Sequence, residues 1–151
     1  MKTNIHILLL TGFLYFMTGC ASWDEPGKTT DCQPDIFPDY KEVTVPCNIA
    51  PLNFMIEGAD RIQARFTSEK GEILTVIGHE GIINIPLKKW RGMLADAEVM
   101  IVEVSAWTDE YPEGVLYKPF TINVAADEID EWAAYRLIEP GYVSWRQLGL
   151  Y

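Results

Sequence analysis

The stretch 98–107, EVMIVEVSAW, decides the fold of this chain, because it is the most hydrophobic run that has the composition of a β-strand. Apolar residues occur on both faces of the extended chain here, which is typical of a strand buried on both sides. The pattern therefore predicts that 98–107 is the central strand of a β-sheet.

The segments around this strand alternate between apolar and polar residues. In 61–67, Ile62, Ala64 and Phe66 share one face, while Arg61, Gln63, Arg65 and Thr67 share the other, as in a half-buried strand. The other expected elements are a turn at 69–72, strands at 73–78 and 82–85, a brief helix or loop at 87–97 and a last strand at 120–124. Six or seven short strands in about 90 residues predict an all-β domain, an immunoglobulin-like β-sandwich.

A short C-terminal helix is expected after residue 126, where the period of the pattern changes. Asp127 is a capping residue with Asp130 three positions later, and Glu139–Gly141 ends the helical pattern. The apolar residues that fall on one helical face are Ile129, Trp132, Ala133 and Leu137.

The N-terminal end has the features of an export signal. Residues 5–17 are mostly apolar and follow Lys2, but they are too few for a membrane span, which needs about 20. The segment 17–20, Met-Thr-Gly-Cys, resembles the lipobox of bacterial lipoproteins, with Met17 in place of the usual leucine. The resemblance implies that a diacylglyceryl group is attached to Cys20, which cleavage makes the new N-terminus. The alternative is ordinary signal cleavage after Gly19-Cys20-Ala21.

These patterns divide the chain into four parts. Residues 1–19 are a lipoprotein signal peptide, and 20–35, rich in polar residues, Pro and Gly, form a flexible tether. Residues 36–126 form the β-sandwich, and 127–151 form the helix and an apolar tail.

The expected location is the outer membrane, to which the lipid on Cys20 anchors the protein. The acid pair Asp24-Glu25 either marks export to the outer leaflet, as in some lipoproteins, or belongs to a solvated tether. The periplasmic and surface faces therefore both stay open.

The charge of the chain argues against nucleic acid as a partner. Removal of 1–19 takes away Lys2 and no acid, which changes the formal net charge from −10 to −11. Such a surface is repelled by phosphate backbones and by anionic lipid.

Cys32 and Cys47 remain once Cys20 carries lipid, in a compartment where disulfides persist. They are either a candidate disulfide, which would contribute roughly 3 kcal/mol by closing a loop of about 15 residues, or two unpaired thiols. Their spacing and the distance in sequence to His79 do not match a zinc site, so no metal is expected.

Two segments, 37–54 (FPDYKEVTVPCNIAPLNF) and 127–151 (DEIDEWAAYRLIEPGYVSWRQLGLY), resemble the N-terminal module of a group of bacterial envelope lipoproteins. In that group a small β domain precedes a TolB-like β-propeller, and some members are labelled cytochrome c biosynthesis proteins. This chain has neither the propeller nor the Cys-x-x-Cys-His segment that covalent haem requires, so no haem or other cofactor is expected. The resemblance implies either a truncated member of the family or a module that works alone.

No catalytic constellation stands out from the sequence. Glu103, Asp109 and Glu110 are candidate acids for a hydrolase, but with 22 acids in the chain some must lie close together by chance. His79 is isolated in an expected turn, without the partners of a catalytic triad. The chain is therefore not expected to be an enzyme.

The function expected is that of a lipid-anchored, non-catalytic interaction or spacer module for another envelope protein. Its candidate partner surface is the apolar tail with Tyr142, Trp145 and Leu148, unless that tail folds back on the sandwich. The alternative is a glycan-binding surface lipoprotein, in which Trp107 and Tyr111 of the loop 105–114 stack on sugar rings.

Overall fold

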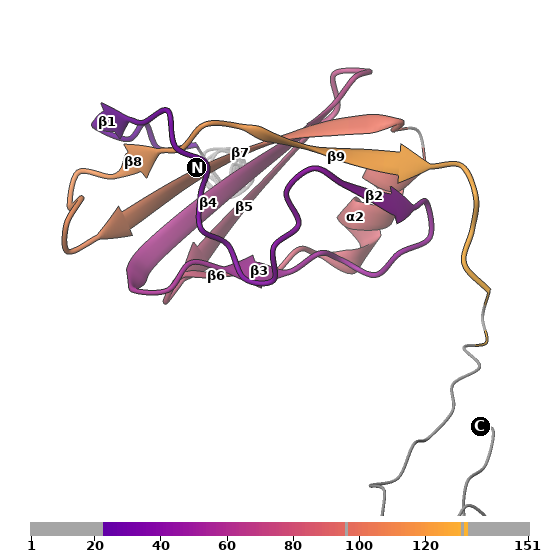
Figure 1. Cartoon of the computed structure of the whole chain (residues 1–151), viewed down its shortest axis with the longest axis horizontal. Helices are drawn as coiled ribbons and strands as arrows, with labels where there is room; N and C mark the ends of the chain where they lie inside the picture. The colour runs from indigo at the N-terminus through magenta and orange to yellow at the C-terminus, as the bar shows by residue number, and fades with distance from the viewer. Residues whose placement is uncertain (1–22, 96, 131, 133–151) are drawn as a thin grey trace, which may run out of the picture.

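A computed structural model describes residues 23–95, 97–130 and 132 of the chain, and most of its regular structure is β-strand (Figure 1). The all-β class expected from the sequence is therefore confirmed. The elements are β1 (Lys28–Thr29), β2 (Val43–Pro46), β3 (Phe54–Met55), β4 (Ala59–Ser68), β5 (Ile73–His79), β6 (Ile82–Ile83), α2 (Leu87–Leu94), β7 (Val99–Thr108), β8 (Val115–Leu116) and β9 (Phe120–Ala125).

Strand β7 is the centre of a seven-stranded sheet, as its composition predicts. It pairs with β4 over Met100–Thr108, with Ala106 opposite Ile62 and Val102 opposite Phe66. Its other edge is shared by β9 and then β8. The long strands β4, β5 and β7 run side by side in Figure 1. The sheet is completed by β1, parallel to β8, and β2, parallel to β9, while β3 and β6 form a separate two-stranded sheet.

One face of the large sheet forms the hydrophobic core. Ile62, Ala64 and Phe66 are all buried, which confirms the alternation read from 61–67. Helix α2 contributes Trp90, whose ring meets that of Phe66 edge to face at 5.9 Å. The indole N–H of Trp90 donates a hydrogen bond to the carbonyl oxygen of Ile49, so the ring is buried without an unpaired polar atom.

The other face of β4, β5 and β7 is called here the open face. Residues opposite one another in paired strands point to the same side, so the register defines the face. Its most exposed apolar side chains are Ile73, with 65% of its surface accessible, and Ile101, with 48%. The members of the open face are Arg61, Gln63, Arg65, Thr67, Ile73, Thr75, Ile77, His79, Val99, Ile101, Glu103, Ser105 and Trp107.

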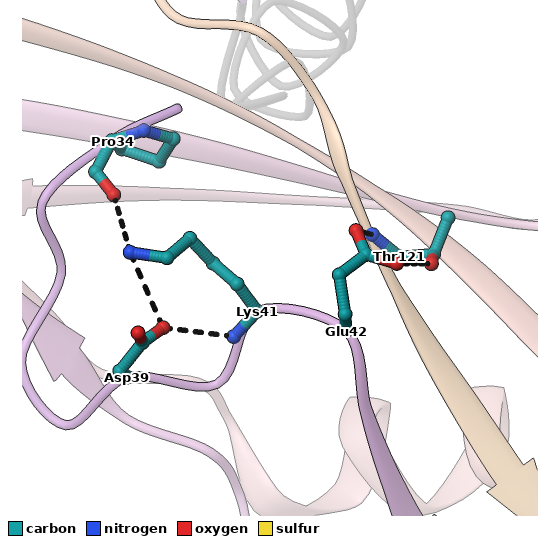
Figure 2. A network of polar contacts seen from close by, with 5 residues as sticks. All are labelled: Pro34, Asp39, Lys41, Glu42 and Thr121. Atoms are coloured by element: carbon teal, nitrogen blue, oxygen red, sulfur yellow. Dashed lines mark hydrogen bonds and ion pairs between the residues drawn. The ribbon is translucent and has the colours of Figure 1, made fainter. Parts of the chain in front are cut away.

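Strand β2 is joined to β9 by Glu42, immediately before β2 (Figure 2). The Glu42 carboxylate accepts hydrogen bonds from the hydroxyl of Thr121 at 2.7 Å and from its backbone N–H at 3.0 Å. The hydroxyl and then the amide of Thr121 lower the pKa of Glu42, because both stabilise the charged form. The Glu42 N–H in turn donates to the Thr121 carbonyl oxygen, which sets the register of β2 on β9.

The turn that leads to β2 is held by Lys41 (Figure 2). Its ammonium group donates to the carbonyl oxygen of Pro34 at 3.1 Å and lies 3.3 Å from the Asp39 carboxylate. The backbone N–H of Lys41 also donates to that carboxylate and is the main cause of the lowered pKa of Asp39. These contacts hold the turn that contains Pro34, Asp39 and Lys41 immediately before β2.

The helix expected to begin at Asp127 does not begin there. Residues 127–130 and 132 are not helical, and the Asn48 side chain instead bonds both backbone groups of Ile129. Because Asn48 satisfies the N–H and the C=O of Ile129, the chain leaves β9 in a bonded, non-helical conformation. The rest of the expected helix lies outside the described residues.

Candidate functional site

A short N-terminal strap, residues 23–26, lies across the open face. The ring of Trp23 covers the Arg65 guanidinium, with 4.0 Å between the guanidinium carbon and the ring centre. The backbone N–H of Asp24 donates to the Gln63 side-chain oxygen at 3.1 Å, and the Gln63 amide donates back to the Asp24 carbonyl oxygen at 2.5 Å. The Asp24 carboxylate pairs with Arg61. Gln63 is consequently only 1% exposed.

The residues after the strap are also attached to the domain. The Gly27 N–H donates to the Glu113 carbonyl oxygen, β1 pairs with β8, and the Cys32 carbonyl oxygen accepts from the Lys118 N–H. The sequence predicts a flexible tether over 20–35, but in the structure the part from Trp23 onward is bonded to the domain. Its polar groups are bonded to the sheet, because Gln63, Arg61 and the edge of β8 offer partners that the sequence of the segment does not reveal.

The acidic and basic side chains of the open face pair with one another. Arg65 lies 3.5 Å from Glu103, and Arg61 pairs with Asp24 of the strap. Glu103, a candidate hydrolase acid, thus has a cation as its partner, while Asp109 and Glu110 are exposed in the loop beyond β7. The open face combines apolar side chains with two neutral ion pairs.

Ser105 is a buried residue of the open face that the sequence did not single out. It lies opposite Gln63 in β4 and Leu116 in β8, and it is 0% exposed. Its hydroxyl has no hydrogen-bond partner among the described residues. In the sequence, Gln63 lies on the polar face of its predicted strand and Ser105 lies on a face that mixes polar and apolar residues. Neither position predicts burial, and only the structure shows that both side chains are covered.

Trp107 and Tyr111, the proposed sugar platform, are both half-buried. The Arg61 guanidinium lies over the Trp107 ring, 3.7 Å from its centre, and the Lys28 ammonium lies over the Tyr111 ring at 4.4 Å. Gly114 also packs close to Trp107, since a Cβ atom there would be 2.5 Å from the indole. The ring faces that carry these contacts are not available for stacking on a sugar.

A pocket of about 300 Å³ lies beside Tyr111. Hydrogen bonding to the Glu110 carboxylate raises the pKa of the Tyr111 hydroxyl, because the bond stabilises the protonated form. Trp107 does not line the pocket, whose walls are Lys28, Glu110, Tyr111, Pro112, Glu113 and Gly114.

The candidate disulfide between Cys32 and Cys47 is not formed in the structure, and both thiols are free. The Cys32 carbonyl oxygen accepts a hydrogen bond from the Lys118 N–H, so Cys32 lies near the start of β9. Cys47 follows Pro46, which pairs with Ala125, so Cys47 lies near the end of β9. Seven residues of extended chain span roughly 20 Å, while a disulfide needs Cα atoms within about 7 Å. The Cys47 thiol instead donates to the carbonyl oxygen of Ala126 at 3.4 Å, at the rim of a pocket of about 620 Å³.

Four other residues predicted to be functional lie outside the described part of the chain. They are the lipidation candidate Cys20 and the candidate partner surface, Tyr142, Trp145 and Leu148. His79 lies inside it and is exposed at the end of β5. Within residues 23–95, 97–130 and 132, no three His, Cys, Asp or Glu side chains are grouped so that they could hold a metal ion.

No family model, curated protein or solved structure matches this chain. The resemblance to the propeller-containing lipoproteins therefore stays a prediction, and the motif at Cys20 and the geometry of the open face are the features that bear on function.

Proposed function

We propose that this chain is a lipid-anchored β domain of a bacterial envelope, which acts by contact and has no catalytic function of its own. The observation that carries the proposal is the strap. Trp23 is held on the open face only three residues after Cys20, so a lipid on Cys20 would join the bilayer directly to a folded surface. The outer membrane is the proposed location.

The sequence supports export, and the open face supports a contact role. The apolar run 5–17 and the lipobox-like 17–20 would carry the chain out of the cytoplasm and modify it there. None of the helices among the described residues is long and apolar enough to span a bilayer. Ile73 and Ile101 expose apolar surface of the kind that marks interaction sites. A spacer or docking role for another envelope domain or protein is the form of this function that the family resemblance favours.

We also propose that the fold is related to the immunoglobulin sandwich. The order β9-β7-β4-β5 corresponds to strands G, F, C and C′ of the variable-type sheet. The two-stranded sheet β3–β6 stands where the second sheet would lie, and Trp90 of α2 packs on the core face of β4. The topology supports the relationship, although the second layer is much smaller than in a standard sandwich.

Lipidation tests the main proposal. The N-terminal peptide of the protein purified from its host is expected to begin at a diacylglyceryl-modified Cys20, because residues 17–20 form the processing site. In a Cys20→Ala variant, both the lipid mass and cleavage after Gly19 should be lost. Intact-mass and peptide mass spectrometry measure both properties.

Cys32→Ala provides the matched control, since Cys32 is an exposed free thiol in the folded domain. This variant should keep the lipid and its membrane fractionation. An unmodified and uncleaved N-terminus in the native protein, recovered in the soluble fraction, would contradict the proposal.

Glycan binding is the second candidate, supported by the pocket beside Tyr111, which has room for one sugar ring. On this hypothesis a Tyr111→Ala variant loses retention on a column of the bound glycan, while Trp107→Ala, outside the pocket lining, retains it. Retention that Tyr111→Ala leaves unchanged would remove this candidate.

A further inference from the structure

We propose that the open face lies against the lipid bilayer, so that the anchored domain rests on the membrane surface instead of standing away from it. The inference depends on the proposed lipid anchor at Cys20 and adds the orientation of the domain. It names a lipid surface as the partner of the open face.

The length of chain between the anchor and the strap limits how far the domain can lie from the membrane. Cys20 precedes Trp23 by three residues, and three extended residues span at most about 11 Å. Trp23 is itself held on Arg65, in the middle strand of the open face. The bilayer surface must therefore come close to this face.

Apolar side chains surround the attachment point of the strap. Thr67 lies two residues beyond Arg65 on β4, and its partners on either side are Ile73 of β5 and Ile101 of β7. From strand spacing and rise, both isoleucines are roughly 8 Å from Arg65. Val99, 37% exposed, lies two residues before Ile101 on β7 and extends this apolar surface. Ile77, also 37% exposed, lies opposite Gln63 on the other side of the Arg65 row.

The charges of the open face also favour a lipid surface. The formal net charge of the whole chain is −10, which opposes approach to a membrane that carries anionic lipid. On the open face, however, Arg61 pairs with Asp24 and Arg65 pairs with Glu103, so both arginines have a carboxylate partner, and the exposed Glu25 of the strap is one further negative charge beside them. This nearly neutral face can approach zwitterionic headgroups while the more acidic surface elsewhere remains in water.

Two positions of similar accessibility provide the test. Ile101, on the open face, is 48% exposed, and Ile82, in the separate β3–β6 sheet, is 40% exposed. Each is replaced by cysteine in the lipidated full chain with Cys32→Ser and Cys47→Ser, and Cys20 does not react because its sulfur carries the lipid. The protein is inserted at one copy or fewer per disc into phosphatidylcholine nanodiscs, and the rate of labelling by a polar maleimide is measured.

The expected result is that I101C reacts at least ten times more slowly in nanodiscs than in detergent, while I82C changes less than twofold. One copy per disc excludes protection by a second copy. Equal rates for I101C and I82C in nanodiscs, with the lipid present by mass spectrometry, would overturn the inference and leave the anchor intact. Such a result would show that the open face stays in water beside the bilayer. A mass without lipid on Cys20 would instead overturn the proposed function, and the inference with it.

Discussion

Replacement of Trp90 by alanine is expected to lower the free energy of unfolding by about 3–5 kcal/mol, the usual cost of removing a buried aromatic ring. Trp90 is 0% exposed, packs edge to face on Phe66 and donates its indole N–H to the Ile49 carbonyl oxygen. The substitution therefore leaves a cavity and an unpaired carbonyl group. Since small domains have a total stability of about 5–15 kcal/mol, the variant should be marginally folded.

Urea unfolding followed by circular dichroism measures this loss without depending on tryptophan fluorescence. The matched control is Trp132→Ala, because Trp132 is 87% exposed and its removal should change the stability by less than about 0.5 kcal/mol. Equal losses in the two variants would show that Trp90 is not part of the core.

Alanine at Gly78 and alanine at Gly92 are expected to change the stability in opposite directions. The turn after β5 has φ of 54° at Glu80 and 71° at Gly81, the left-handed values of a type I′ turn. The turn brings the backbone of Ile82 so close to Gly78 that a Cβ atom on Gly78 would collide with the Ile82 carbonyl group. Because the obstacle is backbone, relief requires a backbone shift, and Gly78→Ala should cost about 1–3 kcal/mol.

Gly92, in α2, has nothing within 4 Å of an added Cβ atom. Gly92→Ala should therefore stabilise the domain by roughly 0.5–1 kcal/mol, because alanine loses less backbone freedom in a helix. Thermal unfolding of both variants tests the pair. A Gly78→Ala variant as stable as the parent would mean that the chain does not approach Gly78 so closely.

The strands were predictable because their evidence lies in consecutive residues. The hydrophobic run 98–107 buries most of its apolar surface in the middle of a sheet, where β7 lies, while Val99 and Ile101 remain partly exposed on the open face. The alternation in 61–67 likewise identifies which side of β4 faces the core. The helical alternative for 87–97 was also available from the sequence, and α2 covers Leu87–Leu94.

The candidate site was much less predictable because its contacts join residues far apart in the chain. Asp24 and Gln63 are 39 positions apart, and the sequence around either residue does not predict their hydrogen bond. A polar stretch such as 20–35 has the same composition whether it is solvated or bonded to a sheet edge. The choice between a Cys32–Cys47 disulfide and two free thiols stayed open for the same reason, since separation in sequence says nothing about which ends of β9 the two thiols approach.

By itself, the sequence determined the β class, the central strand, the core side of β4 and the lipobox-like motif at Cys20, because each depends on the order and polarity of neighbouring residues. Only the tertiary structure decided that residues 23–26 lie on the open face, that Arg61 and Arg65 are neutralised there, and that Trp107 is covered. The physical reason is that strand pairing brings together side chains from separate segments. Their mutual hydrogen bonds and ring contacts then determine which surface remains exposed.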